Sequence, residues 1–148
     1  MTHIRRPFFL VRSRKPPAVF EGSLAAPGGR RRAWIDSLFV DHAIFRIPWT
    51  NLAAVIPGKV YRCNHPTPAR LAAAMRRHHL RTLVNLRGPR KCGSDALSRE
   101  AASRLGLAHL DTALESRGAP PRERLLPFAA LCPAIAFPLL MPLSLLHI

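Results

Sequence analysis

The sequence predicts an α/β fold, with a partial, largely parallel sheet and flanking helices. Short apolar, β-branched runs alternate with amphipathic stretches of about a dozen residues, the pattern of strands joined by crossover helices. Of the 148 residues 48% are apolar, which suffices for the core of one modest domain. The 15 prolines lie mainly near the two ends, so we expect the middle of the chain to carry the fold.

We divide the chain into three segments. Residues 1–32 contain paired prolines, a Pro-Gly-Gly run and Arg30-Arg31-Arg32 without a sustained hydrophobic period, which predicts a basic, disordered leader. Residues 33–126 are expected to form an incomplete α/β domain. Residues 127–148 are expected to be an apolar, Pro-rich tail.

Charge and cysteine content limit the function classes. The net charge is +15, and 20 of the 23 basic residues are arginine. This surplus attracts phosphorylated substrates, nucleic acid or an anionic membrane face, unless it reflects a GC-rich genome and solvated charges. Cys63, Cys92 and Cys132 are too widely spaced for a disulfide framework or a metal site, so we expect a reducing cytoplasm, no metal and no cofactor.

The first predicted elements precede residue 80. Residues 33–47 place three large apolar side chains near one helical face, which indicates a helix. Pro57-Gly58 predicts a turn before a short strand over Lys59–Cys63. Thr67 is a good N-cap and Pro68 fits the first helical position, so a helix follows, with Leu71 and Met75 on its buried stripe.

The later elements continue the alternation. The apolar run 81–86 is typical of a buried strand. Ser94 or Asp95 is expected to cap a helix that ends near Leu105, with Gly106 just past its end. A strand over 107–111 follows, and Pro120-Pro121 then begins a helix that carries charged residues 122–124.

Three motifs at fixed spacing carry a family resemblance. They are Val60-Tyr61-Arg62, His65-Pro66-Thr67-Pro68 and Leu83-Val84-Asn85-Leu86-Arg87. Together they resemble the first half of bacterial tyrosine/dual-specificity protein phosphatases, over roughly residues 33–126. The resemblance implies a cysteine-phosphatase fold and hydrolysis of phosphate monoesters through a phosphocysteine. It also implies a phosphorylated protein or a small phosphate ester as substrate.

The family's signature is His-Cys-x5-Arg, in a loop between a buried strand and a helix N-terminus. Backbone N–H groups and the helix dipole hold phosphate oxygens there and lower the pKa of the cysteine. The arginine binds two oxygens and stabilises the transition state, and an aspartate on another loop protonates the leaving oxygen.

None of the three cysteines fits this signature. Cys63 and Cys92 each precede an arginine by six intervening residues rather than five, and no arginine follows Cys132. An extra residue would misdirect the amide cradle, so we assign no catalytic cysteine or arginine. The chain resembles an enzyme family, and we expect this chain itself to be inactive.

Four further residues are candidates by position. The resemblance places the general acid in the loop 111–120, where Ser116 occupies the usual aspartate position. Asp111 or Glu115 could serve as the acid, or Asp111 could end a strand and Glu115 pair with an arginine. The resemblance also places Arg87 and Arg117 near the phosphate pocket, although arginines in so basic a chain are commonly solvated.

Residues 125–148 contain no Asp, Glu, Lys or Arg. Their length suits a transmembrane helix, but four prolines within them argue against a lone span. Residues 137–141 look like the buried strand that precedes His-Cys in the resembled family. We therefore hypothesise a frameshift or truncation near Met141, and a reading frame that encodes His-Cys-x5-Arg after that codon would support it.

Two other function classes stay open. The arginine-rich chain could be a basic polyanion-binding module that holds nucleic acid without sequence specificity. It could also be a membrane-tethered protein that uses residues 125–148.

Overall fold

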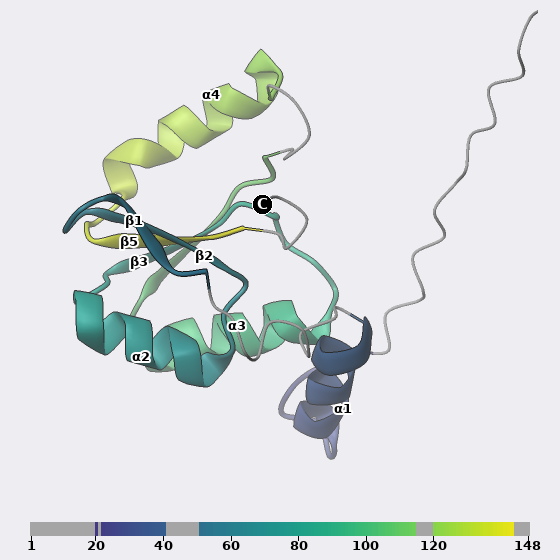
Figure 1. The fold of residues 1–148 in the computed structure, drawn as a ribbon. Helices are drawn as coiled ribbons and strands as arrows, with labels where there is room; N and C mark the ends of the chain where they lie inside the picture. The colour runs from purple at the N-terminus through teal and green to yellow at the C-terminus, as the bar shows by residue number, and fades with distance from the viewer. Residues whose placement is uncertain (1–19, 21, 41–50, 115–119, 144–148) are drawn as a thin grey trace, which may run out of the picture.

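The computed structural model describes Phe20 and residues 22–40, 51–114 and 120–143, and shows an α/β fold (Figure 1). In these residues five strands form one sheet in the order β1-β2-β5-β3-β4. Only the β1–β2 pair is antiparallel, and the other three pairs are parallel. The strands are β1 (Ala53–Ile56), β2 (Val60–Asn64), β3 (Thr82–Asn85), β4 (Ala108–Asp111) and β5 (Leu139–Leu143). The predicted α/β class and the largely parallel sheet are confirmed.

Within the described residues, four α-helices accompany the sheet. They are α1 (Gly29–Ile35), α2 (Pro68–His78), α3 (Gly93–Arg104) and α4 (Arg122–Leu131). A π-helical turn η1 (Asp36–Val40) extends α1, and a 3-10 turn η3 (Cys132–Ala134) follows α4. In Figure 1, α2 and α3 cover one face of the sheet, α1 lies by one end of α3, and α4 lies on the other side of the sheet.

Helix α2 follows its sequence signals. The Thr67 hydroxyl accepts a hydrogen bond from the Arg70 N–H at 3.4 Å, and Pro68 occupies the first turn. Leu71 is fully buried and Met75 is half-buried, so the predicted stripe faces the core. The predicted N-cap, proline position and buried stripe are confirmed.

Helix α3 begins earlier than predicted. Cys92 is its N-cap, not Ser94 or Asp95. The Gly93 N–H donates instead to a carboxylate oxygen of Asp36 at 2.5 Å. A side chain distant in sequence therefore accepts a hydrogen bond from a free backbone N–H of the first turn of α3. Gly106, with φ 68, lies just past the end of the helix as expected.

The predicted leader is partly wrong. Residues 29–32 belong to α1 rather than to a disordered segment, and Phe20 is buried. Phe20 and Ala33 pack with Leu97 of α3, which gives this part of the chain a small core of its own. Residues 1–19 and 21 of the leader lie outside the described residues, as do residues 41–47 of the helix predicted over 33–47.

The main core lies between the sheet and helices α2 and α3. Leu83 of β3 and Leu140 of β5 are fully buried at its centre, together with Leu71 of α2. This core needs β5, because β5 lies between β2 and β3 and hydrogen-bonds to both.

The C-terminal segment is not shown as a separate apolar tail. Residues 127–131 complete α4, and the strand predicted over 137–141 is confirmed as β5, two residues further along. Pro142, in β5, is fully buried, so this stretch is part of the sheet. None of the helices among the described residues is both long and apolar enough to cross a membrane. Residues 144–148 lie outside the described part.

Candidate functional site

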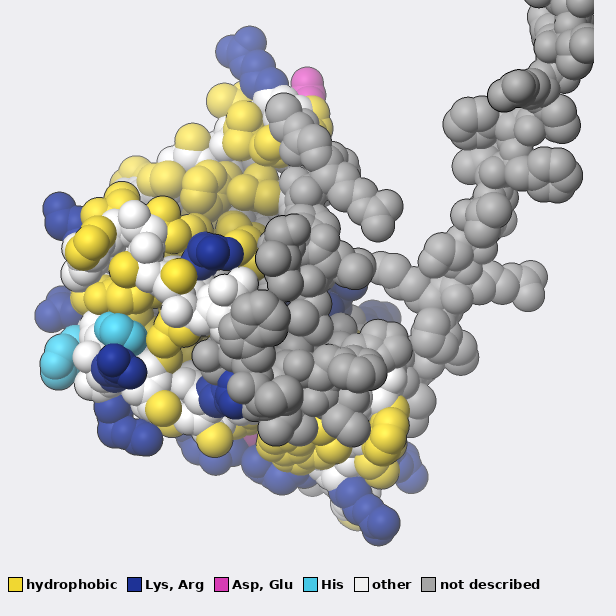
Figure 2. Space-filling view, in the orientation of Figure 1, with side chains coloured by type: hydrophobic (Ala, Val, Ile, Leu, Met, Phe, Trp, Pro, Cys, Tyr) yellow, Lys and Arg dark blue, Asp and Glu magenta, His cyan; other side chains and the backbone are white. Residues whose placement is uncertain are grey.

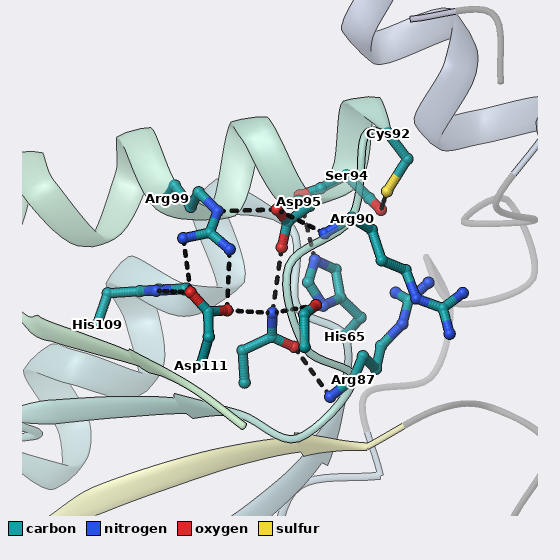
Figure 3. Close-up of polar contacts among 11 residues, drawn as sticks. His65, Arg87, Arg90, Cys92, Ser94, Asp95, Arg99, His109 and Asp111 are labelled. Atoms are coloured by element: carbon teal, nitrogen blue, oxygen red, sulfur yellow. Dashed lines mark hydrogen bonds and ion pairs between the residues drawn. The ribbon is translucent and has the colours of Figure 1, made fainter. Parts of the chain in front are cut away.

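Polar side chains meet where β3 and β4 end beside the first turn of α3 (Figure 3). Asn85, the last residue of β3, is 2% exposed. Its amide nitrogen lies 2.8 Å from Asp111 Oδ1, 3.2 Å from Asp95 Oδ1 and 3.0 Å from the Gly88 carbonyl oxygen. The carboxyl ends of parallel strands are the usual place for ligand sites in open α/β sheets.

Arg99 closes the same cluster from α3. Its Nε donates to Asp95 Oδ2 at 2.8 Å, and its two terminal nitrogens each lie 2.8 Å from an oxygen of Asp111. The Arg99–Asp111 pair is therefore bidentate, the stronger geometry for an arginine and a carboxylate. The cluster fixes α3 against β4.

Asp111 is held in its ionised form. Burial alone would raise its pKa, but hydrogen bonds from Arg99 and Asn85, with the Arg99 charge, outweigh burial and lower the pKa. A carboxyl group in this environment is a poor proton donor near neutral pH. The geometry therefore favours the structural alternative for Asp111 over the general-acid alternative.

His109 adjoins this cluster and is kept neutral by its surroundings. Desolvation lowers the pKa of His109, and the nearby Arg99 charge lowers it further, against the opposing effect of Asp111. Its Nδ1 lies 3.7 Å from Asp111 Oδ2. The imidazole is thus a partner of the cluster at low pH only.

Arg87 joins the cluster through its backbone. Its N–H donates to Asn85 Oδ1 at 3.2 Å, and the residue forms an isolated bridge with Ala113. Figure 3 shows the guanidinium groups of Arg87 and Arg90 on one side, directed away from the Arg99–Asp111 pair. The structure thus connects two predicted candidates, Arg87 and Asp111, through Asn85. The other two, Glu115 and Arg117, lie outside the described residues.

The three cysteines occupy three separate environments. Cys63 is buried in the main core, and burial raises the pKa of its thiol to about 12, so the thiol stays protonated. The Cys92 Sγ lies 3.4 Å from Ser94 Oγ at the start of α3. Cys132 is exposed in η3 after α4. The described residues therefore do not place a cysteine at the end of the central strand β5.

A small recess lies next to the cluster. His65, Thr67 and Ser94 line it with Trp34 and Leu97, and it has room for about one water molecule. The His65 Nε2 lies 3.1 Å from the Ser94 carbonyl oxygen, so the end of β2 is tied to the start of α3.

The sequence did not identify Asn85, Asp95 and Arg99 as members of one cluster. The spacing of Asp95 and Arg99, four residues apart on a predicted helix, is a signal for an ion pair that could have been used. Within the described parts of the chain, no group of three His, Cys, Asp or Glu side chains is placed to hold a metal ion.

No protein-family model matches the chain, and no curated protein matches it.

Proposed function

We propose that this chain is a tyrosine/dual-specificity phosphatase-like protein that supplies the scaffold of a phosphate site without hydrolysing phosphate esters itself. The proposal rests on the resemblance of its three motifs to that family. The substrate class it implies is a phosphorylated protein or a small phosphate monoester.

One structural observation carries the proposal. The strand β5 lies between β2 and β3, parallel to both, and residues 137–141 are the ones that resemble the family's strand before the nucleophile loop. The motifs that carry the resemblance lie on β2 and β3 and just after them, so they flank β5 on both sides. His65 and Arg87 follow the carboxyl ends of these two strands, at the edge toward which β5 runs (Figure 3).

The proposed lack of turnover follows from the sequence and from the thiols. These 148 residues contain no His-Cys-x5-Arg. The Cys63 thiol is buried and protonated, and Cys92 is separated from Arg99 by six residues within one helix and its cap. Without a cysteine and an arginine at the signature spacing in one loop, both the covalent intermediate and its main electrostatic stabilisation are missing.

An aryl phosphate assay tests the proposal. The purified chain is incubated with para-nitrophenyl phosphate, and we expect release of nitrophenol no faster than in buffer alone. Cys63→Ser and Cys92→Ser serve as matched variants and should leave this background unchanged. Turnover by the wild type that either substitution abolishes would contradict the proposal, because it would identify a working nucleophile.

A further inference from the structure

Two basic residues flank the beginning of the central strand, at the edge of the sheet opposite the cluster. Val60, Leu139 and Thr82 are aligned across β2, β5 and β3. Lys59 and Arg81 directly precede β2 and β3, so they lie on either side of β5, about 10 Å apart for two strand spacings. Hydrogen bonds fix both backbones there: the Leu139 N–H donates to the Lys59 oxygen at 2.9 Å, and the Arg81 N–H donates to the Pro138 oxygen at 2.8 Å.

The end of α2 brings more positive charge to the same edge. Because α2 connects two parallel strands, it runs back along the sheet and ends where β3 begins. Its last turn and the residue after it contribute Arg76, Arg77 and His79, which are all exposed. We call Lys59, Arg76, Arg77, His79 and Arg81 the amino-edge patch. In Figure 2, basic and histidine side chains gather on this left side of the molecule, with no acidic side chain visible among them.

The acidic residues that the structure describes do not neutralise this patch. Asp95 and Asp111 are paired with Arg99, and Glu100 is paired with Arg30 and Arg104. Asp36 accepts hydrogen bonds from backbone N–H groups beside α3, and Glu123 lies on α4. Ion pairs in the described part of the chain therefore leave the patch with its full positive charge.

The pKa of His78 responds to the charges around the end of α2. Its ring packs on Tyr61 with the ring centroids 4.2 Å apart. Desolvation lowers the pKa of His78, and the positive charges of Arg77 and His79 lower it further. A neighbouring carboxylate would have opposed these shifts.

Helix capping does not account for the whole patch. Basic residues in the last turn of a helix favour its negative dipole end, which has about half an elementary charge. That preference fits Arg76 and Arg77, which lie in the last turn of α2. It does not explain Lys59 and Arg81, which belong to strand ends and lie on both sides of β5.

We propose that the amino-edge patch binds the phosphate backbone of nucleic acid without sequence preference. Three of its five members are arginines, whose planar, forked donors match phosphate oxygens, and the charges are spread along an edge as a linear polyanion requires. The patch itself contains no Phe, Tyr or Trp side chain for stacking on bases, so its affinity comes mainly from charge. This goes beyond the proposed function, because the patch is at the opposite edge from the cluster.

Salt-dependent binding of the full chain to a labelled 20-base-pair DNA duplex tests the proposal. We compare wild type, the patch variant Arg76→Ala/Arg77→Ala/Arg81→Ala, and a control that loses the same charge elsewhere, Arg31→Ala/Arg32→Ala/Arg122→Ala. The slope of log K against log salt should fall by about 0.9 for each lost phosphate contact, hence by about 2.7 for the patch variant. The control should keep most of the wild-type slope, and unchanged thermal unfolding should show that both variants are folded.

Three outcomes would overturn the proposal. Equal losses in both variants would mean that net charge, not the patch, binds DNA. A wild-type slope in the patch variant would exclude the patch. The third outcome concerns an anionic membrane, because the exposed apolar residues Val55 and Ile56 lie on the neighbouring strand β1. Binding to phosphatidylserine vesicles is therefore measured as well. Patch-dependent binding to these vesicles, with none to DNA, would assign the surface to a membrane instead.

Discussion

At the scale of single residues, Asn85 determines how the candidate site is built. Its side chain contacts both carboxylates of the cluster and its oxygen accepts the Arg87 N–H. A buried amide between two carboxylates needs a cation nearby, and Arg99 supplies it with three contacts at 2.8 Å. Both carboxylates of the cluster are thus held by Arg99 and Asn85, which explains why the cluster holds α3 in place but offers no free acid for catalysis.

The charge state of this cluster predicts how stability depends on pH. Asp111 has a pKa below its unfolded value, so its contribution is fully present above that value and is lost as pH falls through the folded pKa. His109 also has a lowered pKa, so the unfolded chain takes up its proton first, and stability falls below about pH 6.5 as well. The wild type should lose stability in both pH ranges.

Asp111→Asn separates the two contributions. This variant should be less stable than wild type at pH 7, and it should lose less further stability than wild type below about pH 4. Urea unfolding midpoints between pH 7 and pH 3 measure this. If the variant and the wild type lose stability equally below pH 4, the Arg99–Asp111 pair does not lower the pKa of Asp111.

At the scale of elements, β5 and α4 are neighbours in sequence with opposite burial. Leu140 of β5 is fully buried, whereas Leu126 of α4 is 57% exposed. None of the described side chains of α4 is buried, although the helix contains Leu125, Leu126 and Phe128. Helix α4 therefore adds little to the core, and β5 completes it.

Matched leucine substitutions test this difference. Leu140→Ala should cost about 2–5 kcal/mol of unfolding free energy, because it leaves a cavity at the centre of the core. Leu126→Ala should change it by no more than about 0.5 kcal/mol, as for other exposed positions. Urea unfolding of both variants measures the two values. A cost for Leu126→Ala as large as that for Leu140→Ala would mean that α4 packs more closely than the structure shows.

Local sequence signals predicted most of the helices and strands, but not the contacts between residues far apart in the sequence. Thr67-Pro68, the β-branched run before Asn85 and the glycine after α3 are signals within a few residues, so α2, β3 and the end of α3 could be predicted. The start of α3 could not, because its first N–H is capped by Asp36 from 57 residues away. Strand β1 was not assigned either, since residues 53–56 carry no alternation of apolar and polar side chains.

The candidate site was predicted in part for the same reason. Arg87 lies just past β3 and Asp111 ends β4, and local patterns identify both strands, so their proximity follows from parallel strands ending at one edge. Asp95 and Arg99 reach that edge only because α3 packs beside β4, which depends on the crossover and not on nearby residues.

At the scale of the whole molecule, the cluster and the amino-edge patch lie at opposite ends of the parallel strands. The carboxyl edge contains the cluster of Asn85, Asp95, Arg99 and Asp111 and the motifs that carry the phosphatase resemblance. The amino edge contains basic side chains without acidic partners in the described part of the chain. The strand β5 runs from the amino edge to the carboxyl edge and lies between β2 and β3.

Hydrogen exchange of the β5 amides tests this arrangement most directly. Because Leu139 and Leu140 are buried and β5 is paired on both sides, their amides should exchange at the slowest rates in the chain, close to global unfolding. The amides of α4, whose described side chains are not buried, should exchange much faster. Exchange of β5 as fast as that of α4 would contradict the central position of β5, and with it the proposed phosphatase-like scaffold.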